Sequence, residues 1–311
     1  MGREHSLKAP MGQGKPAADQ SDLLKHCVAA TGEFVGTFMF LFFAYLGHQM
    51  SVTQATSLGP NGTNSNSTVI YIAMSYGMSL LVTVWMMYRI SGGLFSLLIC
   101  LQYVVSADLM SRVQTGWMCS VADVRKRRTA ANPLFSPDPA VTLGLVVSGN
   151  MPPVRGLCLF PAQILGGIVA AALAACMIPG DIAIVQTTLA PRVSIAQGCF
   201  LEMFFTALLV FTVLMLAAEK SKDTFIAPLG IGLALFVAQI AGVYYTGASL
   251  NPARSFGPCV AGASFQGYHW IYWVGPYLGA LIAAGYYHFV KFMNYEEVNP
   301  GQDSAGGDFE K

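Results

Sequence analysis

The stretch Thr246-Gly247-Ala248-Ser249-Leu250-Asn251-Pro252-Ala253-Arg254 follows a long apolar segment and decides how the chain folds. Asn251 suits the N-cap of a helix, because its side-chain oxygen can accept hydrogen bonds from backbone N–H groups. Pro252 suits the first helical turn, where its missing N–H costs no hydrogen bond. The stretch therefore predicts a short helix, from about 252 to 262, that begins inside a loop.

The composition around this stretch indicates a polytopic membrane protein. Of 311 residues, 54% are hydrophobic and 11% are charged, and the mean hydropathy is +0.53, whereas a soluble domain carries about 25% charged residues. A membrane-spanning helix needs about 20 mostly apolar residues, because only a helix satisfies its own backbone hydrogen bonds where water is absent. The stretches that meet this requirement are 27–47, 68–90, 156–178, 194–217, 225–245 and 269–292.

Outside residues 96–138, the Lys and Arg side chains lie almost entirely on the side of this topology that holds both termini. Arg192 and the loop residue Arg254 are the exceptions. Because cytoplasmic loops carry the excess of Lys and Arg, both termini are expected in the cytoplasm. Residues 1–26 lack the apolar core of a signal peptide, so the first span is expected to direct insertion into the plasma membrane or another secretory-pathway membrane. The net charge of +1 gives no reason to expect a nucleic-acid partner.

The chain contains an internal repeat of two halves with three spans each. Glu33-Phe34-Val35-Gly36-Thr37 in the first span matches Glu202-Met203-Phe204-Phe205-Thr206 in the fourth. Tyr76-Gly77-Met78-Ser79-Leu80 in the second span matches Ile231-Gly232-Leu233-Ala234-Leu235 in the fifth. Because three is an odd number, the two halves are expected to insert with opposite orientations. A loop at membrane depth must be buried in protein or line a water-filled path, so two such loops would meet at mid-depth.

Several segments in order resemble the major intrinsic protein (aquaporin) family, and in particular its fungal members. They are Asn251–Pro258, Ser91-Gly92-Gly93, Pro139–Gly144, His269–Pro276 and Asn299–Ser304. The resemblance implies an all-α membrane protein with six transmembrane helices and two re-entrant half-helices arranged as an inverted repeat. It also implies a homotetramer in the lipid bilayer, with one pore per subunit for the passive movement of water.

This resemblance divides the chain into a channel domain and two tails. We expect a cytoplasmic tail at 1–26, a channel domain at 27–293 and a second cytoplasmic tail at 294–311. Within the channel domain, residues 96–138 stand between Phe95 and Pro139, where the family has a single Asn. The basic run Arg125-Lys126-Arg127-Arg128 cannot lie in hydrocarbon without a large free-energy cost, so the segment is expected to form a cytoplasmic insert.

We interpret residues 96–137 as a translated retained intron. Ser96 written as AGT contains a GT donor, and Pro137 as CCA followed by Asp138 as GAC contains a CAG acceptor. Joining the flanking A to AC regenerates AAC, the codon of the missing Asn. The alternative is a genuine cytoplasmic loop, with Asp138, Pro139 and Ala140 as the first box. An ionised Asp offers acceptors where Asn also offers donors, so the chain as written is expected to conduct poorly or less selectively.

The family's narrow filter, carried over by spacing from the boxes, falls on Tyr76, Gln239, Ala248 and Arg254. Water-selective members have Phe, His, a small residue and Arg at these positions, so Gln239 leaves the size and polarity of the filter open. Arg254 would place a fixed charge and several donors at the constriction, which opposes cations. Ser255 stands where glycerol-conducting members have Asp, which favours water over glycerol or another small neutral solute.

Two carboxylates and two glycosylation triplets complete the candidate sites. Glu33 and Glu202 lie within predicted spans, where acidic residues often mark ion or proton paths. The resemblance implies instead that they accept hydrogen bonds from the re-entrant loops. Asn61 and Asn66 head Asn-x-Ser/Thr triplets in the first extracellular loop and are candidate acceptors of N-linked glycans.

The sequence leaves two other classes of function open. A secondary transporter also uses inverted repeats and broken helices, but its flux would saturate and depend on a coupling ion. A non-conducting membrane scaffold is a third hypothesis, because the first box is altered. Since the His residues and carboxylates show no catalytic or metal-site spacing, we expect no enzyme activity, no metal and no cofactor.

Overall fold

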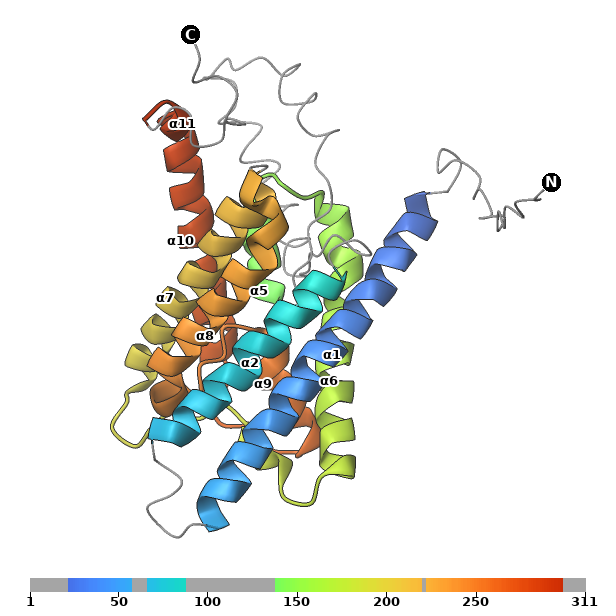
Figure 1. The fold of residues 1–311 in the computed structure, drawn as a ribbon, viewed down its shortest axis with the longest axis vertical. Coiled ribbons are helices and arrows are strands. Elements are labelled where there is room, and N and C mark those ends of the chain that lie inside the picture. The colour runs from blue at the N-terminus through green and yellow to red at the C-terminus, as the bar shows by residue number, and fades with distance from the viewer. Residues whose placement is uncertain (1–21, 58–65, 88–137, 220–221, 299–311) are drawn as a thin grey trace, which may run out of the picture.

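A computed structural model of the protein describes residues 22–57, 66–87, 138–219 and 222–298 (Figure 1). In chain order its elements are α1 (Asp22–Ser57), α2 (Asn66–Met87), α5 (Pro139–Val147), α6 (Pro153–Met177), the 3-10 helix η3 (Ile182–Val185), α7 (Ile195–Val213), the π-helical turn η4 (Leu214–Ala218), the 3-10 helix η5 (Lys222–Ile226), α8 (Ala227–Thr246), α9 (Pro252–Ala261), α10 (Ile271–Phe292) and α11 (Tyr295–Val298). The proposed intron at 96–137, the turn Ser91-Gly92-Gly93, Asn61 and most of both predicted tails lie outside these described residues.

The long helices form one bundle whose members correspond to the six predicted spans. Among the described residues, five segments are long and apolar enough to cross a membrane, namely Ala29–Ser57, Asn66–Met87, Pro153–Met177, Ile195–Ala218 and Thr224–Thr246. Helix α10, with 22 residues, completes the bundle and packs along α7. The predicted all-α membrane fold is therefore confirmed.

Helix α1 differs from the prediction because it is longer at both ends. It begins at Asp22, inside the predicted N-terminal tail, and continues to Ser57, well beyond the expected end at Gly47. An apolar stretch marks where a helix crosses the membrane, but the helix itself can continue into polar sequence. After Gly47 the next glycine or proline is Gly59, followed by Pro60, so the backbone has no local reason to stop earlier.

The two halves of the chain are packed in the same way. In the first half α1 contacts α2 and α6, and in the second half α7 contacts α8 and α10. The halves meet where α2 crosses α8. A Cβ added to Gly77 would lie 3.0 Å from the carbonyl oxygen of Gly232, and one added to Gly232 would lie 2.8 Å from that of Gly77. Because these glycines occupy matching positions of the sequence repeat, the crossing is symmetric and the inverted repeat is confirmed.

Two short helices, α5 with 9 residues and α9 with 10, lie inside the bundle (Figure 1). They are exchanged between the halves, because α9 packs against α6 and α5 packs against α10. The approach of α9 to α6 requires glycine, since a Cβ added to Gly257 would lie 2.4 Å from the carbonyl oxygen of Gly167. Each half-helix thus rests on the third long helix of the other half.

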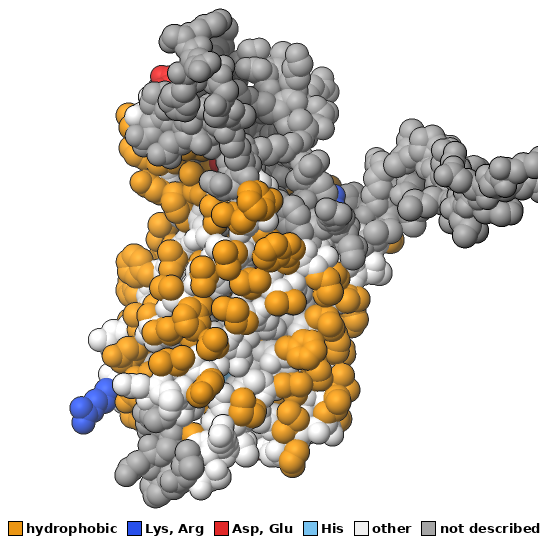
Figure 2. Space-filling view, in the orientation of Figure 1, with side chains coloured by type: hydrophobic (Ala, Val, Ile, Leu, Met, Phe, Trp, Pro, Cys, Tyr) orange, Lys and Arg blue, Asp and Glu red, His pale blue; other side chains and the backbone are white. Residues whose placement is uncertain are grey.

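The outer surface of the bundle is apolar. Large exposed side chains on the long helices include Phe43, Trp85, Phe200, Phe204 and Val237. Figure 2 shows hydrophobic side chains spread over the whole length of the visible face. A soluble protein rarely exposes an apolar patch of this extent, because its contact with water is unfavourable. Lipid removes that cost, so the protein is an integral, multi-pass membrane protein.

Candidate functional site

The second re-entrant helix begins as its sequence predicts. Asn251 caps α9, because its Oδ1 accepts the backbone N–H of Ala253 at 2.8 Å and that of Arg254 at 3.3 Å. Pro252 occupies the first turn, and both Pro252 and Ala253 are buried. The cap satisfies N–H groups that no helical carbonyl could reach, so the helix starts within the protein interior.

Asp138 caps α5 with nearly the same geometry. Its Oδ1 accepts the N–H of Ala140 at 2.8 Å, and Pro139 opens the helix. The backbone angles are φ −137° and ψ 118° at Asp138, against φ −130° and ψ 111° at Asn251. Asp138 therefore occupies the place in the first half that Asn251 occupies in the second.

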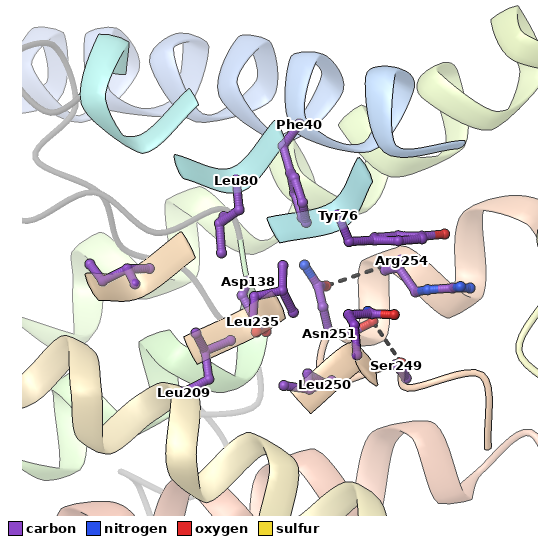
Figure 3. A pocket seen from close by; sticks show the side chains of 12 residues that line it. Phe40, Tyr76, Leu80, Asp138, Leu209, Leu235, Ser249, Leu250, Asn251 and Arg254 are labelled. Carbon is purple, nitrogen blue, oxygen red and sulfur yellow. Dashed lines mark hydrogen bonds between the residues drawn. The ribbon is translucent and has the colours of Figure 1, made fainter. Parts of the chain in front are cut away.

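The N-termini of α5 and α9 meet at a pocket inside the bundle (Figure 3). Its apolar wall is formed by Phe40, Leu80, Leu209, Ile231, Leu235 and Leu250. Its polar lining is formed by Tyr76, Asp138, Gln239, Ser249, Asn251 and Arg254. Five residues singled out from the sequence, Tyr76, Asp138, Gln239, Asn251 and Arg254, are thus brought together. Pro139, Ala140, Pro252 and Ala253 are buried in the adjoining helix turns.

Arg254 is fixed on several sides although it is almost fully buried, with 1% of its surface exposed. One guanidinium nitrogen donates to the carbonyl oxygen of Val185 at 2.8 Å, and the other to that of Gly247 at 3.4 Å. The guanidinium carbon lies 4.8 Å from the centre of the Tyr76 ring, within the range of a cation–π interaction. A buried charge held by neutral dipoles keeps its field, so the pocket is positive at this end.

The orientation of the Gln239 amide is set by a backbone carbonyl group. Its Nε2 donates to the carbonyl oxygen of Ala248 at 2.8 Å. Because a carbonyl oxygen can only accept, the amide nitrogen must face Ala248, and the amide oxygen is left for the pocket. Ala248 is buried and contributes its backbone oxygen to this contact. Its φ of 43° lies in the left-handed region, which aims that carbonyl group out of the normal helical direction.

Three polar atoms of the pocket residues have no hydrogen-bond partner among the described residues. They are Asp138 Oδ2, Gln239 Oε1 and Arg254 Nε. Burying a polar group without a partner costs about 1–3 kcal/mol. All three belong to residues that line the same pocket, so a small molecule with hydrogen-bonding groups would satisfy them. The pocket offers one donor and two acceptors to such a molecule.

Glu202 holds the loop that leads into α9. Its Oε1 accepts from the N–H of Ser249 at 2.9 Å and the hydroxyl of Thr246 at 2.7 Å, while Oε2 accepts from the N–H of Leu250 at 2.8 Å. Leu250 has a φ of 53°, which costs energy for a branched side chain. Three hydrogen bonds to one buried carboxylate offset that cost.

Glu33 occupies the matching place in α1 and is fully buried. Its charge interacts with that of Arg155 near the start of α6. The loop before Pro139 that it is expected to support belongs to residues 88–137, outside the described part of the chain. The glycosylation candidate Asn66 is the first residue of α2 and is exposed.

Several contacts of the site carried no signal in the sequence. Val185 takes part through its backbone oxygen, which any residue would supply. Ser255 receives a hydrogen bond from Thr187 Oγ1 at 2.8 Å and contacts the Ser249 hydroxyl, which ties the loop to the segment after η3. His48 approaches the pocket from α1, with its Nδ1 3.3 Å from the Tyr76 hydroxyl. Within the described residues, no three His, Cys, Asp or Glu side chains are grouped to hold a metal ion.

Comparison with known proteins gives consistent results. The chain matches the family model described as Major intrinsic protein over residues 18–119 and 137–287. It is 55% identical to "Probable aquaporin-3" of Gibberella zeae over 284 residues, which cover 91% of this chain and 85% of that protein. It is 46% identical to "Aquaporin-7" of Botryotinia fuckeliana over 283 residues, which cover 90% of this chain and 53% of that protein, so it spans about half the length of this relative.

A solved structure resembles the fold. The X-ray structure of the aquaglyceroporin from Plasmodium falciparum superimposes with a TM-score of 0.61 and 17% sequence identity, covering 86% of this chain and 99% of that chain. At this level of identity the likeness concerns the arrangement of helices alone.

Proposed function

The chain belongs to the major intrinsic protein family, and on that premise we propose that it is a membrane channel through which water moves passively. The family is one of channels, and its relatives are named aquaporins. The observation that carries the proposal is the meeting of α5 and α9 at one pocket. Both helices direct their N-termini, the positive ends of their dipoles, toward it.

The polarity of the pocket supports a neutral, hydrogen-bonding permeant. Two positive helix ends and the Arg254 guanidinium disfavour a cation at this position. The apolar wall offers a passing molecule no side-chain hydrogen bonds. The polar side chains of Asn251, Gln239 and Arg254 offer it a small number of them. A water molecule both donates and accepts, so it can exchange these partners in sequence without being held at any one of them.

Within this channel we assign Tyr76, Gln239, Ala248 and Arg254 to the selectivity filter, and Asp138–Ala140 and Asn251–Ala253 to the two pore boxes. The stacking of Tyr76 on Arg254 and the hydrogen bond from Gln239 to Ala248 support the filter. The Ser255 hydroxyl oxygen accepts a hydrogen bond from Thr187 and contacts the Ser249 hydroxyl, where an Asp would present a carboxylate. We therefore favour water over glycerol, which remains the alternative permeant.

Glu202 and Glu33 are assigned to support the re-entrant loops, and the hydrogen bonds of Glu202 to Ser249 and Leu250 support this role. We further propose a homotetramer, cytoplasmic tails at 1–26 and 294–311, a channel domain at 27–293 and residence in the plasma membrane or another secretory-pathway membrane. The apolar exterior of the bundle agrees with subunit and lipid contacts.

We also propose that residues 96–137 are a translated retained intron. The family match leaves out 120–136, which lie within this segment, although it includes 96–119. Sequencing the mature messenger RNA tests this idea: a message that always contains these codons contradicts it. A non-conducting form of the chain is the second candidate, favoured by the unpartnered Oδ2 of Asp138 in the pocket.

The test of the channel is a paired measurement of water and glycerol flux in proteoliposomes. One sample carries the full chain, and a second carries the chain without 96–137 and with Asn at 138. Water-channel function predicts osmotic water flux above that of empty vesicles in the second sample, with little glycerol uptake. Glycerol uptake without added water flux would contradict the assignment. Water flux in the second sample alone would identify the full chain as the non-conducting form.

A further inference from the structure

Helix α1 reaches the proposed filter with two side chains one helical turn apart. The hydroxyl of Tyr45 donates to the carbonyl oxygen of Arg254 at 2.7 Å. The Nδ1 of His48 lies 3.3 Å from the hydroxyl of Tyr76. Because residues three apart lie on one helix face, α1 contacts both walls of the filter from the same side. The position of Arg254 along its helix and the position of the Tyr76 ring thus depend on one element.

The contact between His48 and Tyr76 is buried on both sides. His48 is 7% exposed and Tyr76 is fully buried. Their rings meet edge to face, with centroids 5.9 Å apart and planes inclined by 71°. A buried tyrosine hydroxyl requires a hydrogen-bond partner, and an imidazole nitrogen serves as one in either tautomer because the hydroxyl can donate or accept.

The direction of the Tyr76 hydroxyl decides what the ring presents to the pocket. Figure 3 shows the ring lying along the Arg254 side chain, with its hydroxyl pointing away from Asp138 and Asn251. The ring face, 4.8 Å from the guanidinium carbon, therefore borders the passage as a phenylalanine ring would. The Arg254 guanidinium also interacts with the Tyr76 hydroxyl. Without His48 the hydroxyl keeps this partner, and a turn of the ring toward it would narrow the filter.

We propose that His48 is a positioning residue of the filter, which binds the Tyr76 hydroxyl and so holds the ring against Arg254 at a fixed separation. The inference rests on the proposed water-channel function, and it adds a residue of α1 to the filter assigned from α2, α8, the loop before α9 and α9 itself. His48 touches no permeant; it acts through Tyr76.

The test compares the full chain with the variants H48L, H48N, Y76F and H48L/Y76F, and with Y71F as a control at an exposed tyrosine of α2. Leucine keeps the bulk of His48 but makes no hydrogen bond. H48L should lower water flux per channel roughly three- to tenfold, the effect of one lost hydrogen bond. Y76F removes the hydroxyl that His48 binds, so its own flux is the reference against which H48L/Y76F is compared.

Rescue separates positioning from simple packing. H48L/Y76F should recover the flux of Y76F, and H48N should retain that of the original chain, because its side-chain amide can replace Nδ1. If H48L and H48L/Y76F lose flux equally, His48 is a packing residue and the proposal is wrong. An H48L channel with unchanged flux overturns it as well.

Thermal unfolding in detergent provides a readout that does not depend on conduction. H48L should lower the unfolding midpoint when residue 76 is Tyr and leave it nearly unchanged when residue 76 is Phe. Equal shifts in both backgrounds contradict the pairing. If H48L is not recovered as folded protein, recovery of H48L/Y76F supports the proposal and loss of both overturns it. If neither the full chain nor the chain without 96–137 and with Asn at 138 gives water flux above that of empty vesicles, the channel proposal is refuted, and the unfolding series still decides the role of His48.

Discussion

Asp138 and Asn251 cap their half-helices in the same way, each through an Oδ1 that accepts the N–H two residues further on at 2.8 Å. They differ at the other side-chain atom. Asp138 presents a buried Oδ2 without a partner among the described residues, whereas the amide of Asn251 carries two N–H donors. The symmetric positions therefore offer a permeant unlike chemistry.

The first prediction concerns this asymmetry. Asp138→Asn in the full chain keeps the Oδ1 cap and replaces Oδ2 by a donor, so water flux per channel should rise. The exchange turns one of the two unpartnered acceptors of the pocket into a donor, and a change of about 1 kcal/mol in one hydrogen bond corresponds to roughly a fivefold change in flux. Stopped-flow light scattering of proteoliposomes measures it. Asp181→Asn is the matched control, since Asp181 caps η3 through Ala183 at an exposed site. Equal flux in D138N and the original chain would show that the group at the Oδ2 position does not limit conduction.

The second prediction concerns the charge of Arg254. Arg254→Val removes the fixed charge that faces the Tyr76 ring, and leakage of protons and small cations should rise at least ~10-fold, since a like charge at 4 Å opposes them by about 4 kcal/mol near a protein surface. Proton flux under a potassium–valinomycin potential, read with an enclosed pH-sensitive dye, measures it. Arg192→Val removes an exposed arginine and should have no such effect. If vesicles that carry R254V leak protons and cations no faster than vesicles with the original chain, Arg254 does not contribute to the barrier.

The third prediction concerns the support of the loop before α9. Glu202→Gln preserves shape but turns one acceptor into a donor, which would face the N–H of Ser249 or Leu250. A buried N–H left unpaired costs about 1–3 kcal/mol. The unfolding midpoint in detergent should fall and water flux should decrease together. Glu297→Gln, at an exposed position of α11, is the control. An unchanged midpoint in E202Q would show that the loop holds its conformation without this carboxylate.

The fourth prediction concerns the contact between α6 and α9. Gly257→Ala places a Cβ 2.4 Å from the carbonyl oxygen of Gly167, a backbone atom that cannot move alone. Overpacking of this kind costs about 1–3 kcal/mol. We expect a lower unfolding midpoint and reduced flux, because α9 carries both Asn251 and Arg254. Gly285→Ala in α10 meets nothing within 4 Å and should behave like the original chain. Normal flux in G257A would mean that α9 can shift without affecting the site.

The fold was largely predictable because membrane helices depend on length and hydropathy, which are local properties. The start of α9 was predictable for a similar reason, since Asn251 and Pro252 together specify a cap and a first turn. The extent of α1 was not, because polar residues from His48 to Ser57 give no signal against continuing a helix. Hydropathy marks the membrane portion of a helix rather than its ends.

The candidate site was predictable in its members but not in its contacts. Spacing from the boxes assigned Gln239 and Arg254 to the same filter, and the structure brings both to the pocket. The Ala248 carbonyl group determines which atom of Gln239 faces the pocket. That carbonyl group is placed by a left-handed backbone conformation, which the residue type Ala does not predict. His48 contacts a residue of another helix, and a histidine in an apolar helix does not indicate which neighbour it will meet.

The exchange of half-helices between the two repeats has a consequence for how the molecule is made. A nascent chain that has emerged only as far as α6 contains α5 without the α10 surface it rests on, and α6 awaits α9 to cover its glycine face. The pocket is lined in part by Ser249, Leu250, Asn251 and Arg254, so we expect that a polypeptide truncated before α9 lacks one side of the pocket.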